Sequence, residues 1–173
     1  MTDAPYGTQT DPATLTMERL LPGPIERVWT WLTDSDHRRR WLAAGPMDLT
    51  PGGTVALTWR NDELTTPPGT RPEGMTPEHS MTGRVIAADP PRHLSYDWPG
   101  VGEVTFDLAP AGDQVRLRLT HRRIPDAGTR LGVSAGWHAH LDLLAAGLAG
   151  LPPTPHWDNF TRLREIYRAR LTP

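Results

Sequence analysis

Six short segments of this chain alternate apolar and polar residues with a period of two, although one of them, 82–88, is less regular than the rest. Such alternation places the apolar side chains of a β-strand on one face and the polar ones on the other. It is typical of antiparallel strands with one face against a core and one face in water. Short connections that contain Pro and Gly favour a meander. The segments are Leu15–Arg19, Val55–Trp59, Thr82–Ala88, Leu94–Trp98, Val104–Leu108 and Val115–Thr120.

Apolar residues at helical spacing predict two short helices after the first strand, a long helix after the last strand, and a final helix. This order of elements predicts an α+β fold in which a curved antiparallel sheet covers a helix. The predicted helices are 24–33, a short helix that is capped by Asp34 or Ser35 and ends at Trp41-Leu42, 129–151 and 155–171.

The composition excludes several classes of protein. A net charge of −2 argues against a dedicated nucleic-acid-binding protein, and the absence of Cys excludes disulfides, thiolate zinc sites and Cys nucleophiles. The N-terminal stretch lacks the basic and apolar parts of a signal peptide. The longest apolar run, Leu143–Leu151, is about half as long as a membrane span. We therefore expect a cytoplasmic protein without membrane contact, with a polar lead-in over 1–13 and a single domain over 14–172.

Five stretches of sequence occur in an order that is typical of one superfamily. They are PIERVWTWLTDSDHRRRWL from Pro24, PGGTVALTW from Pro51, GRVIAADPPRHLSYDW from Gly83, VTFDLAPAGDQVRLRLTHRR from Val104 and AGWHAHLDLLAAGLAG from Ala135. With them the chain resembles the SRPBCC superfamily, which has the START-like helix-grip fold. Within that superfamily it is most similar to the branch named after the activator of the 90-kDa heat-shock chaperone ATPase. The resemblance runs from about residue 15 to residue 171.

This resemblance implies about seven antiparallel strands wrapped around the long C-terminal helix, with a cavity between them. Proteins of the superfamily bind varied apolar or amphipathic small molecules, and some are cyclases or hydrolases. We therefore expect a protein that binds a small hydrophobic or aromatic-containing ligand and needs no cofactor. One alternative is a cyclase-like or hydrolytic enzyme. The other is an interaction protein that contacts a chaperone, and a homodimer also stays open.

Seven residues are candidates for the lining of this cavity. Alternation places the aromatic residues of the strands on the apolar side, and His121 continues the inward register of its strand. On the long helix, His140 lies about 20° outside the apolar stripe. The candidates are Trp59, Tyr96, Trp98, Phe106, His121, Trp137 and His140. The enzyme alternative requires Tyr96, His121 and His140 to converge, because a His near pH 7 can move a proton. The alternative to a cavity is that these side chains form only core.

Two other patterns on the long helix suggest a serine nucleophile and a metal site, but we expect neither. A G-x-S-x-G match begins at Gly132, and Ser134, His138 and Asp142 are four residues apart. A nucleophile of this type needs a strained turn between a strand and a helix, whereas these residues follow one flank of a helix with Asp142 directed to solvent. His138 and His140 lie about 200° apart on that helix, so one metal ion cannot reach both. We expect no catalytic residue and no metal site.

The segment 61–80 is long for a hairpin connection. Loops of this length are usually lids or mobile segments. This one contains several Pro and Gly and almost no apolar residue that could anchor it. We expect it to be mobile and to border the cavity entrance, because segments with few buried contacts open at low free energy. A tolerated surface insertion is the alternative.

Overall fold

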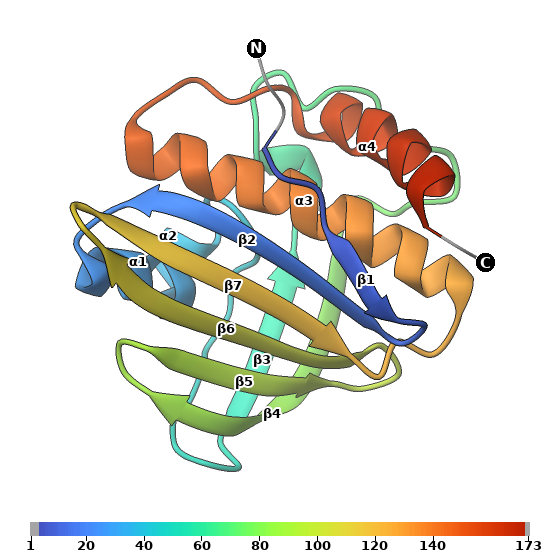
Figure 1. Ribbon diagram of the computed structural model, residues 1–173. Coiled ribbons are helices and arrows are strands. Elements are labelled where there is room, and N and C mark those ends of the chain that lie inside the picture. The colour runs from blue at the N-terminus through green and yellow to red at the C-terminus, as the bar shows by residue number, and fades with distance from the viewer. Residues whose placement is uncertain (1–3, 172–173) are drawn as a thin grey trace.

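The computed structural model describes residues 4–171 of the chain. Seven antiparallel strands form one curved sheet in the order β1-β2-β7-β6-β5-β4-β3 (Figure 1). Strands β4 to β7 form the predicted meander. Strand β2 pairs with β7, so two strands that are far apart in the sequence lie side by side. The strands are β1 (Thr8–Asp11), β2 (Thr14–Pro22), β3 (Thr54–Trp59), β4 (His79–Asp89), β5 (His93–Trp98), β6 (Gly102–Ala111) and β7 (Gln114–Arg122).

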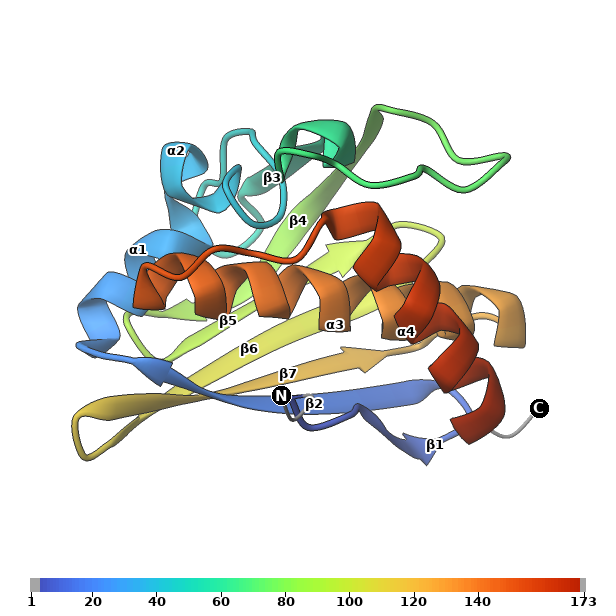
Figure 2. The ribbon, with the colours of Figure 1, turned by 90° about the horizontal axis from the view of Figure 1, so that it is seen from above.

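The helices lie on one side of the sheet. The long helix α3 crosses one face of the sheet, α4 lies beside α3, and α1 and α2 lie at one end (Figure 2). Because both the sheet and α4 cover α3, this helix is buried on more than one side. The helical elements are α1 (Ile25–Thr33), α2 (Ser35–Arg38), the 3₁₀-helix η1 (Asn61–Glu63), α3 (Ala127–Ala149) and α4 (His156–Arg170).

The structure confirms the α+β architecture and all six strands that alternation predicts. It adds β1, which lies within 1–13 and pairs with β2. This strand is short and polar at the edge of the sheet, so it carries no apolar alternation that could reveal it. Several helix bounds also differ from the prediction, most of all those of α2 and α3. Helix α2 ends at Arg38, and α3 ends at Ala149 because Gly150 adopts a left-handed conformation with φ of 68°.

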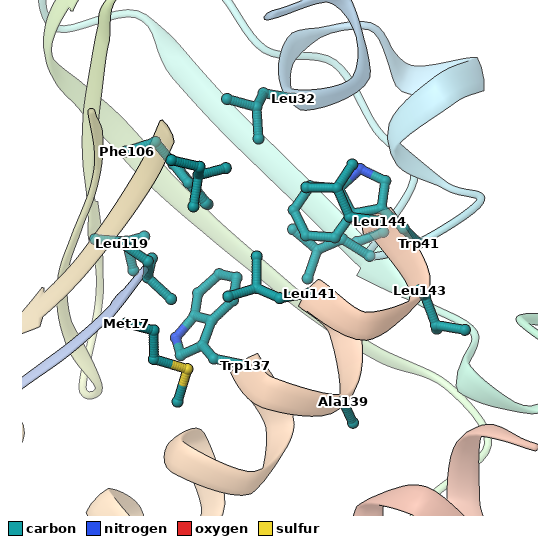
Figure 3. Close-up of a cluster of buried hydrophobic side chains, with 14 of the residues drawn as sticks. Met17, Leu32, Trp41, Phe106, Leu119, Trp137, Ala139, Leu141, Leu143 and Leu144 are labelled. Carbon is teal, nitrogen blue, oxygen red and sulfur yellow. The ribbon is translucent and has the colours of Figure 1, made fainter. Parts of the chain in front are cut away.

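A cluster of buried side chains joins the sheet to α3 (Figure 3). Met17, Phe106 and Leu119 extend from the sheet, and Trp137 and Leu141 extend from α3. Each of them is at most 3% exposed. Burial of each such side chain contributes about 1.5–3 kcal/mol, so this contact fixes the position of α3 over the sheet.

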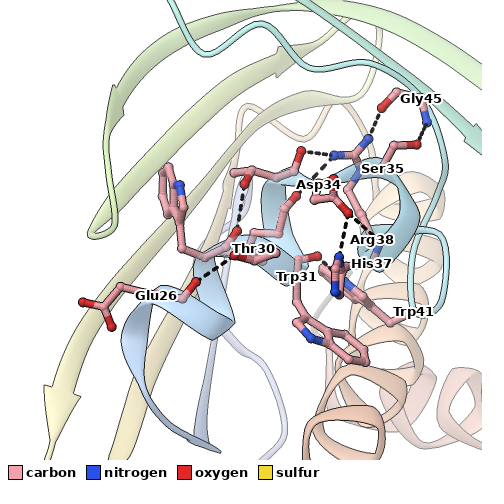
Figure 4. A network of polar contacts seen from close by, with 12 residues as sticks. Glu26, Thr30, Trp31, Asp34, Ser35, His37, Arg38, Trp41 and Gly45 are labelled. Atoms are coloured by element: carbon pink, nitrogen blue, oxygen red, sulfur yellow. Dashed lines mark hydrogen bonds and ion pairs between the residues drawn. The ribbon is translucent and has the colours of Figure 1, made fainter.

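The buried side chain of Arg38 connects the short helices to the segment that leads into β3 (Figure 4). Its Nε donates to the carbonyl oxygen of Ala43 at 3.1 Å. Its terminal nitrogens donate to the carbonyl oxygens of Leu32, Thr33 and Gly45. A planar guanidinium has several donors in fixed directions, so one side chain satisfies carbonyls from both ends of this turn.

Removal of this guanidinium is expected to destabilise the protein strongly. In Arg38→Ala, several carbonyl oxygens that Arg38 satisfies lose their partner, and the free energy of unfolding should fall by about 3 kcal/mol or more. Arg39 is exposed and adjacent, so Arg39→Ala is the matched control and should change it by less than about 0.5 kcal/mol. Urea unfolding followed by tryptophan fluorescence measures both. Equal effects of the two variants would contradict the role of Arg38.

Candidate ligand-binding site

A cavity of about 400 Å³ lies between the sheet, α3, α4 and the segment that follows β3. This volume is within the range of small-molecule sites, about 300–1,000 Å³. No Asp, Glu, Lys or Arg is among its lining residues. The lining residues are Leu42, Trp59, Asn61, Gly74, Met75, Thr76, His79, Trp98, Gly132, Val133, Gly136, Trp137, His140, His156, Trp157 and Phe160.

Helix α3 presents Gly132, Gly136 and His140 to the cavity. These residues are four apart, so they lie on one side of the helix. A methyl group added at either glycine would meet no atom within 4 Å. Gly147 of the same helix differs, because a Cβ there would lie 2.7 Å from the ring of Trp31. Gly147 therefore permits close packing, whereas the two cavity glycines leave space.

Aromatic rings form the walls of the cavity. The rings of Trp59 and Trp98 stack with centroids 5.1 Å apart and planes inclined by 16°. The ring of Trp137 stands at 87° to that of Trp98. On the side of α4, the rings of Trp157 and Phe160 are inclined by 88°. The walls are therefore flat, apolar surfaces.

One part of the lining carries nitrogen and oxygen atoms, and we call His140, His156 and Asn61 the polar end of the cavity. His140 Nδ1 lies 2.7 Å from the carbonyl oxygen of Trp41. The rings of His140 and His156 lie 4.8 Å apart. His156 Nδ1 and Asn61 Oδ1 are buried and have no hydrogen-bond partner.

Both histidines of the polar end are neutral at pH 7. Burial lowers the pKa of His140 to about 4, although the hydrogen bond to Trp41 opposes this shift. Burial lowers the pKa of His156 to about 2, and the neighbouring His140 adds to this effect. The two histidines of the polar end therefore offer a ligand dipoles and rings but no charge.

The first part of the segment 61–80 is attached to the start of α4. Trp157 Nε1 donates to Asp62 Oδ1 at 2.7 Å, and the backbone N–H of Trp157 donates to the carbonyl oxygen of Pro68 at 2.9 Å. The backbone N–H of Thr70 donates to Asp158 Oδ1 at 2.9 Å. Hydrogen bonds rather than apolar contacts therefore anchor the first half of this segment, and its mobility stays a prediction.

The second part of this segment lies at the mouth of the cavity. Gly74, Met75, Thr76 and the first residue of β4, His79, are exposed and belong to the lining. The polar end, in contrast, includes the buried His140 and His156. The structure thus confirms that the segment borders the cavity.

Four of the seven predicted site residues line the cavity, namely Trp59, Trp98, Trp137 and His140. Tyr96, Phe106 and His121 do not, so the convergence of Tyr96, His121 and His140 around one volume is wrong. Tyr96 is fully buried, and burial raises its pKa. Alternation identifies the inward face of a strand, but it does not distinguish packed positions from those beside a void.

Both ring nitrogens of His121 are occupied within the protein. Its Nδ1 accepts from Trp137 Nε1 at 3.0 Å. Its Nε2 therefore carries the proton and donates to the carbonyl oxygen of Val101 at 3.0 Å. Burial lowers the pKa of His121. This neutral histidine positions the indole of Trp137, which forms one wall of the cavity.

Sequence analysis missed the residues that α4 and the segment 61–80 bring to the cavity, among them Asn61, Met75, His156, Trp157 and Phe160. The sequence shows the helical spacing of the apolar residues of α4, but it does not show which elements this helix packs against. For α3 a signal existed in the spacing of Gly132, Gly136 and His140. Gly132 and Gly136 are also the two glycines of the G-x-S-x-G match.

The G-x-S-x-G match lies inside α3, where Ser134 is fully buried and donates its hydroxyl to the carbonyl oxygen of Arg130 at 2.7 Å. His138 Nδ1 lies 2.8 Å from Tyr167 Oη of α4. The prediction that Asp142 points to solvent is wrong, because its Oδ2 accepts from Asn159 Nδ2 of α4 at 2.9 Å. Helix α4 covers a flank that a helical wheel alone presents as exposed.

Residues 4–171 contain neither a metal-binding cluster nor a helix that could span a membrane. No three His, Asp or Glu side chains of this part of the chain are grouped so that they could hold a metal ion. Within the same residues, no helix combines the length and apolar character that crossing a bilayer requires.

The fold and the cavity define an α+β helix-grip protein. Residues 22–149 match the family model for activator of Hsp90 ATPase homolog 1-like proteins, and the chain belongs to this family. The protein encoded by gene BPP1335 of Bordetella parapertussis has a similar solution structure, with a TM-score of 0.81 and 42% identity over 99% of this chain and 92% of that chain.

Two more distant structures share the fold. CalU16 from Micromonospora echinospora has a TM-score of 0.65 and 23% identity over 90% of this chain and 86% of that chain. The Aha1 dimer from Colwellia psychrerythraea has a TM-score of 0.56 and 16% identity over 78% of this chain and 95% of that chain. No curated protein matches the chain.

Lowering the pH from 7 to 5 is expected to destabilise the protein through His140 and His156. The pKa of His140 is about 4 in the folded state and about 6.5 in the unfolded state, so the unfolded state binds more protons in this range. Its stabilising contribution is complete above pH ~6.5 and is lost as the pH falls towards the folded pKa. His140 accounts for roughly 2 kcal/mol of the loss at pH 5.

Urea unfolding of the wild type and of His140→Asn at pH 7 and pH 5 measures this contribution. The Asn side chain can still donate to the Trp41 carbonyl but does not titrate, so the variant should lose less stability on acidification. His156, the titratable neighbour, is unchanged in both proteins. An equal loss in both proteins would contradict the assignment.

Proposed function

We propose that this protein binds a small hydrophobic or aromatic-containing molecule in the cavity between the sheet and α3. The observation that supports this most is a void of about 400 Å³ with aromatic walls and no charged lining residue. Small-molecule sites are usually concave, mostly apolar pockets with a few polar groups, and this cavity, which opens to the surface at Gly74, Met75 and Thr76, has that form.

The two cavity glycines support the same function. Gly in a helix interior costs about 1 kcal/mol relative to Ala. At Gly132 and Gly136 a Cβ would meet no neighbour, so close packing does not require glycine at either position. Their effect is to widen the cavity at the expense of helix stability, as expected of a site selected for binding.

The enzyme alternative has less support. It depends on Tyr96, His121 and His140, and of these only His140 lines the cavity. A general acid or base also acts best with a pKa near the working pH. Burial moves the pKa of His140 to about 4 and thus away from that range.

Filling the cavity is expected to abolish binding without loss of the fold. We predict that Gly136→Leu weakens the binding of N-phenyl-1-naphthylamine, an uncharged fluorescent dye, by about tenfold or more, because the dye and the new side chain need the same volume. Gly136→Ala is the matched control. It should raise the free energy of unfolding by about 0.5–1 kcal/mol and keep most of the binding.

Dye fluorescence gives the affinity, and thermal unfolding verifies that each variant is folded. Binding of the dye by folded Gly136→Leu with the affinity of the wild type would contradict the proposed site. Absence of dye binding by the wild type would contradict the proposed function itself.

We also propose that the protein forms a homodimer, by analogy with the Colwellia psychrerythraea protein, which is described as a dimer. Sedimentation velocity should show a two-chain species at micromolar concentration, and a single-chain species throughout would contradict it. Contact with a chaperone has less support. Among residues 4–171, the large apolar side chains that are exposed are Leu20, Met75, Ile86 and Leu151. Leu20 and Ile86 lie on β2 and β4, which three strands separate in the sheet, so they do not form one apolar patch.

A further inference from the structure

We propose that the cavity selects uncharged, planar aromatic molecules with a hydroxyl or N–H group, which donates a hydrogen bond to His140 Nε2 at the polar end. This inference rests on the proposed function and adds the chemical class of the ligand. Three properties of the cavity carry it: an oriented acceptor, unpartnered polar atoms beside that acceptor, and flat walls without charge.

The hydrogen bond between His140 and Trp41 determines which nitrogen of the His140 ring can accept a hydrogen bond from a ligand. A carbonyl oxygen can only accept, so Nδ1, at 2.7 Å from the Trp41 oxygen, must carry the proton of the neutral ring. The lone pair is then on Nε2. The ring lines the cavity, and the described residues provide no hydrogen-bond partner for Nε2. A ligand that meets this nitrogen must therefore be a donor.

The neighbouring atoms of the polar end also lack partners. His156 is 1% exposed, and its Nδ1 has no hydrogen bond, as is also true of Asn61 Oδ1. Most buried polar atoms in proteins have a partner. Asn61 lies in η1, which α4 contacts through the hydrogen bond between Asp62 and Trp157. The unpartnered atoms thus lie on elements that are held together beside His140.

The walls decide the shape and charge of the ligand. The stacked rings of Trp59 and Trp98 and the perpendicular ring of Trp137 favour a flat aromatic molecule, which packs against ring faces and edges. The lining contains no Asp, Glu, Lys or Arg, and His140 and His156 at the polar end are neutral at pH 7. A carboxylate or ammonium would therefore lose its hydration without gaining a partner, and this loss disfavours charged analogues.

Three competitors of N-phenyl-1-naphthylamine test this selection on the wild-type protein at pH 7. They are 2-naphthol, 2-methoxynaphthalene and 2-naphthoate, which share a bicyclic ring. We expect 2-naphthol to displace the dye at a concentration roughly fivefold lower than 2-methoxynaphthalene, the difference that one net hydrogen bond makes. We expect 2-naphthoate to be the weakest competitor. Equal displacement by the first two, or strongest displacement by naphthoate, would overturn the inference.

Two variants locate the hydrogen bond. His140→Asn keeps a donor for the Trp41 carbonyl and removes Nε2. It should bind the dye more weakly, because the N–H group of the dye loses its acceptor, and it should lose the preference for 2-naphthol. His93→Asn makes the same substitution at a histidine of β5 that does not line the cavity, and it should keep the preference. A preference that survives in His140→Asn, or that is also lost in His93→Asn, would overturn the inference. If His140→Asn does not fold, the three competitors on the wild type still decide.

The experiment distinguishes failure of the proposed function from failure of this inference. If the dye does not bind to the wild type, both the proposed function and this inference are overturned. If the dye binds but the hydroxyl makes no difference, the cavity is a general apolar site, and only the inference is overturned.

Discussion

The hydrogen bonds of Arg38 to backbone carbonyls are the interaction on which the site depends. They fix the turn that follows α2, and Trp41 lies in that turn. Trp41 is anchored again by its own Nε1, which donates to the carbonyl oxygen of Trp31 at 2.8 Å. The Trp41 carbonyl in turn accepts a hydrogen bond from His140 Nδ1. A buried guanidinium outside the lining thus sets the tautomer of a histidine in the cavity, through backbone groups that cannot rotate independently.

The cavity exists because large rigid rings surround the side of α3 on which two residues, Gly132 and Gly136, have no side chain. Dense packing is the ordinary result when side chains can interdigitate. Here the rings of Trp59 and Trp98 occupy each other's faces, and His121 holds the indole of Trp137. These contacts keep the rings from collapsing into the space beside Gly132 and Gly136. Glycine occupies two helix positions where alanine would be more stable, and it leaves the space beside these rings open.

Much of the fold could be predicted from the sequence, and less of the site could. Alternation over six segments identified their strands and inward faces, because a β-strand has a strict period of two. The same alternation treated Tyr96 and Trp98 as equivalent, although Tyr96 is packed in the core and Trp98 borders the void. The two residues differ in position along the sheet relative to α3. That position follows from how the helix crosses the sheet, which no local pattern contains.

The sequence by itself determined the α+β class, the inward register of the strands and the aromatic character of the residues available for a site. These properties depend on local periodicity and on residue type. Only the tertiary structure decided that α4 and the segment 61–80 bring His156, Trp157 and Asn61 beside His140. It also decided that Asp142 faces α4 instead of solvent. Contacts between segments that lie far apart in the chain depend on the packing of whole elements, and the protonation states of buried histidines depend on those contacts.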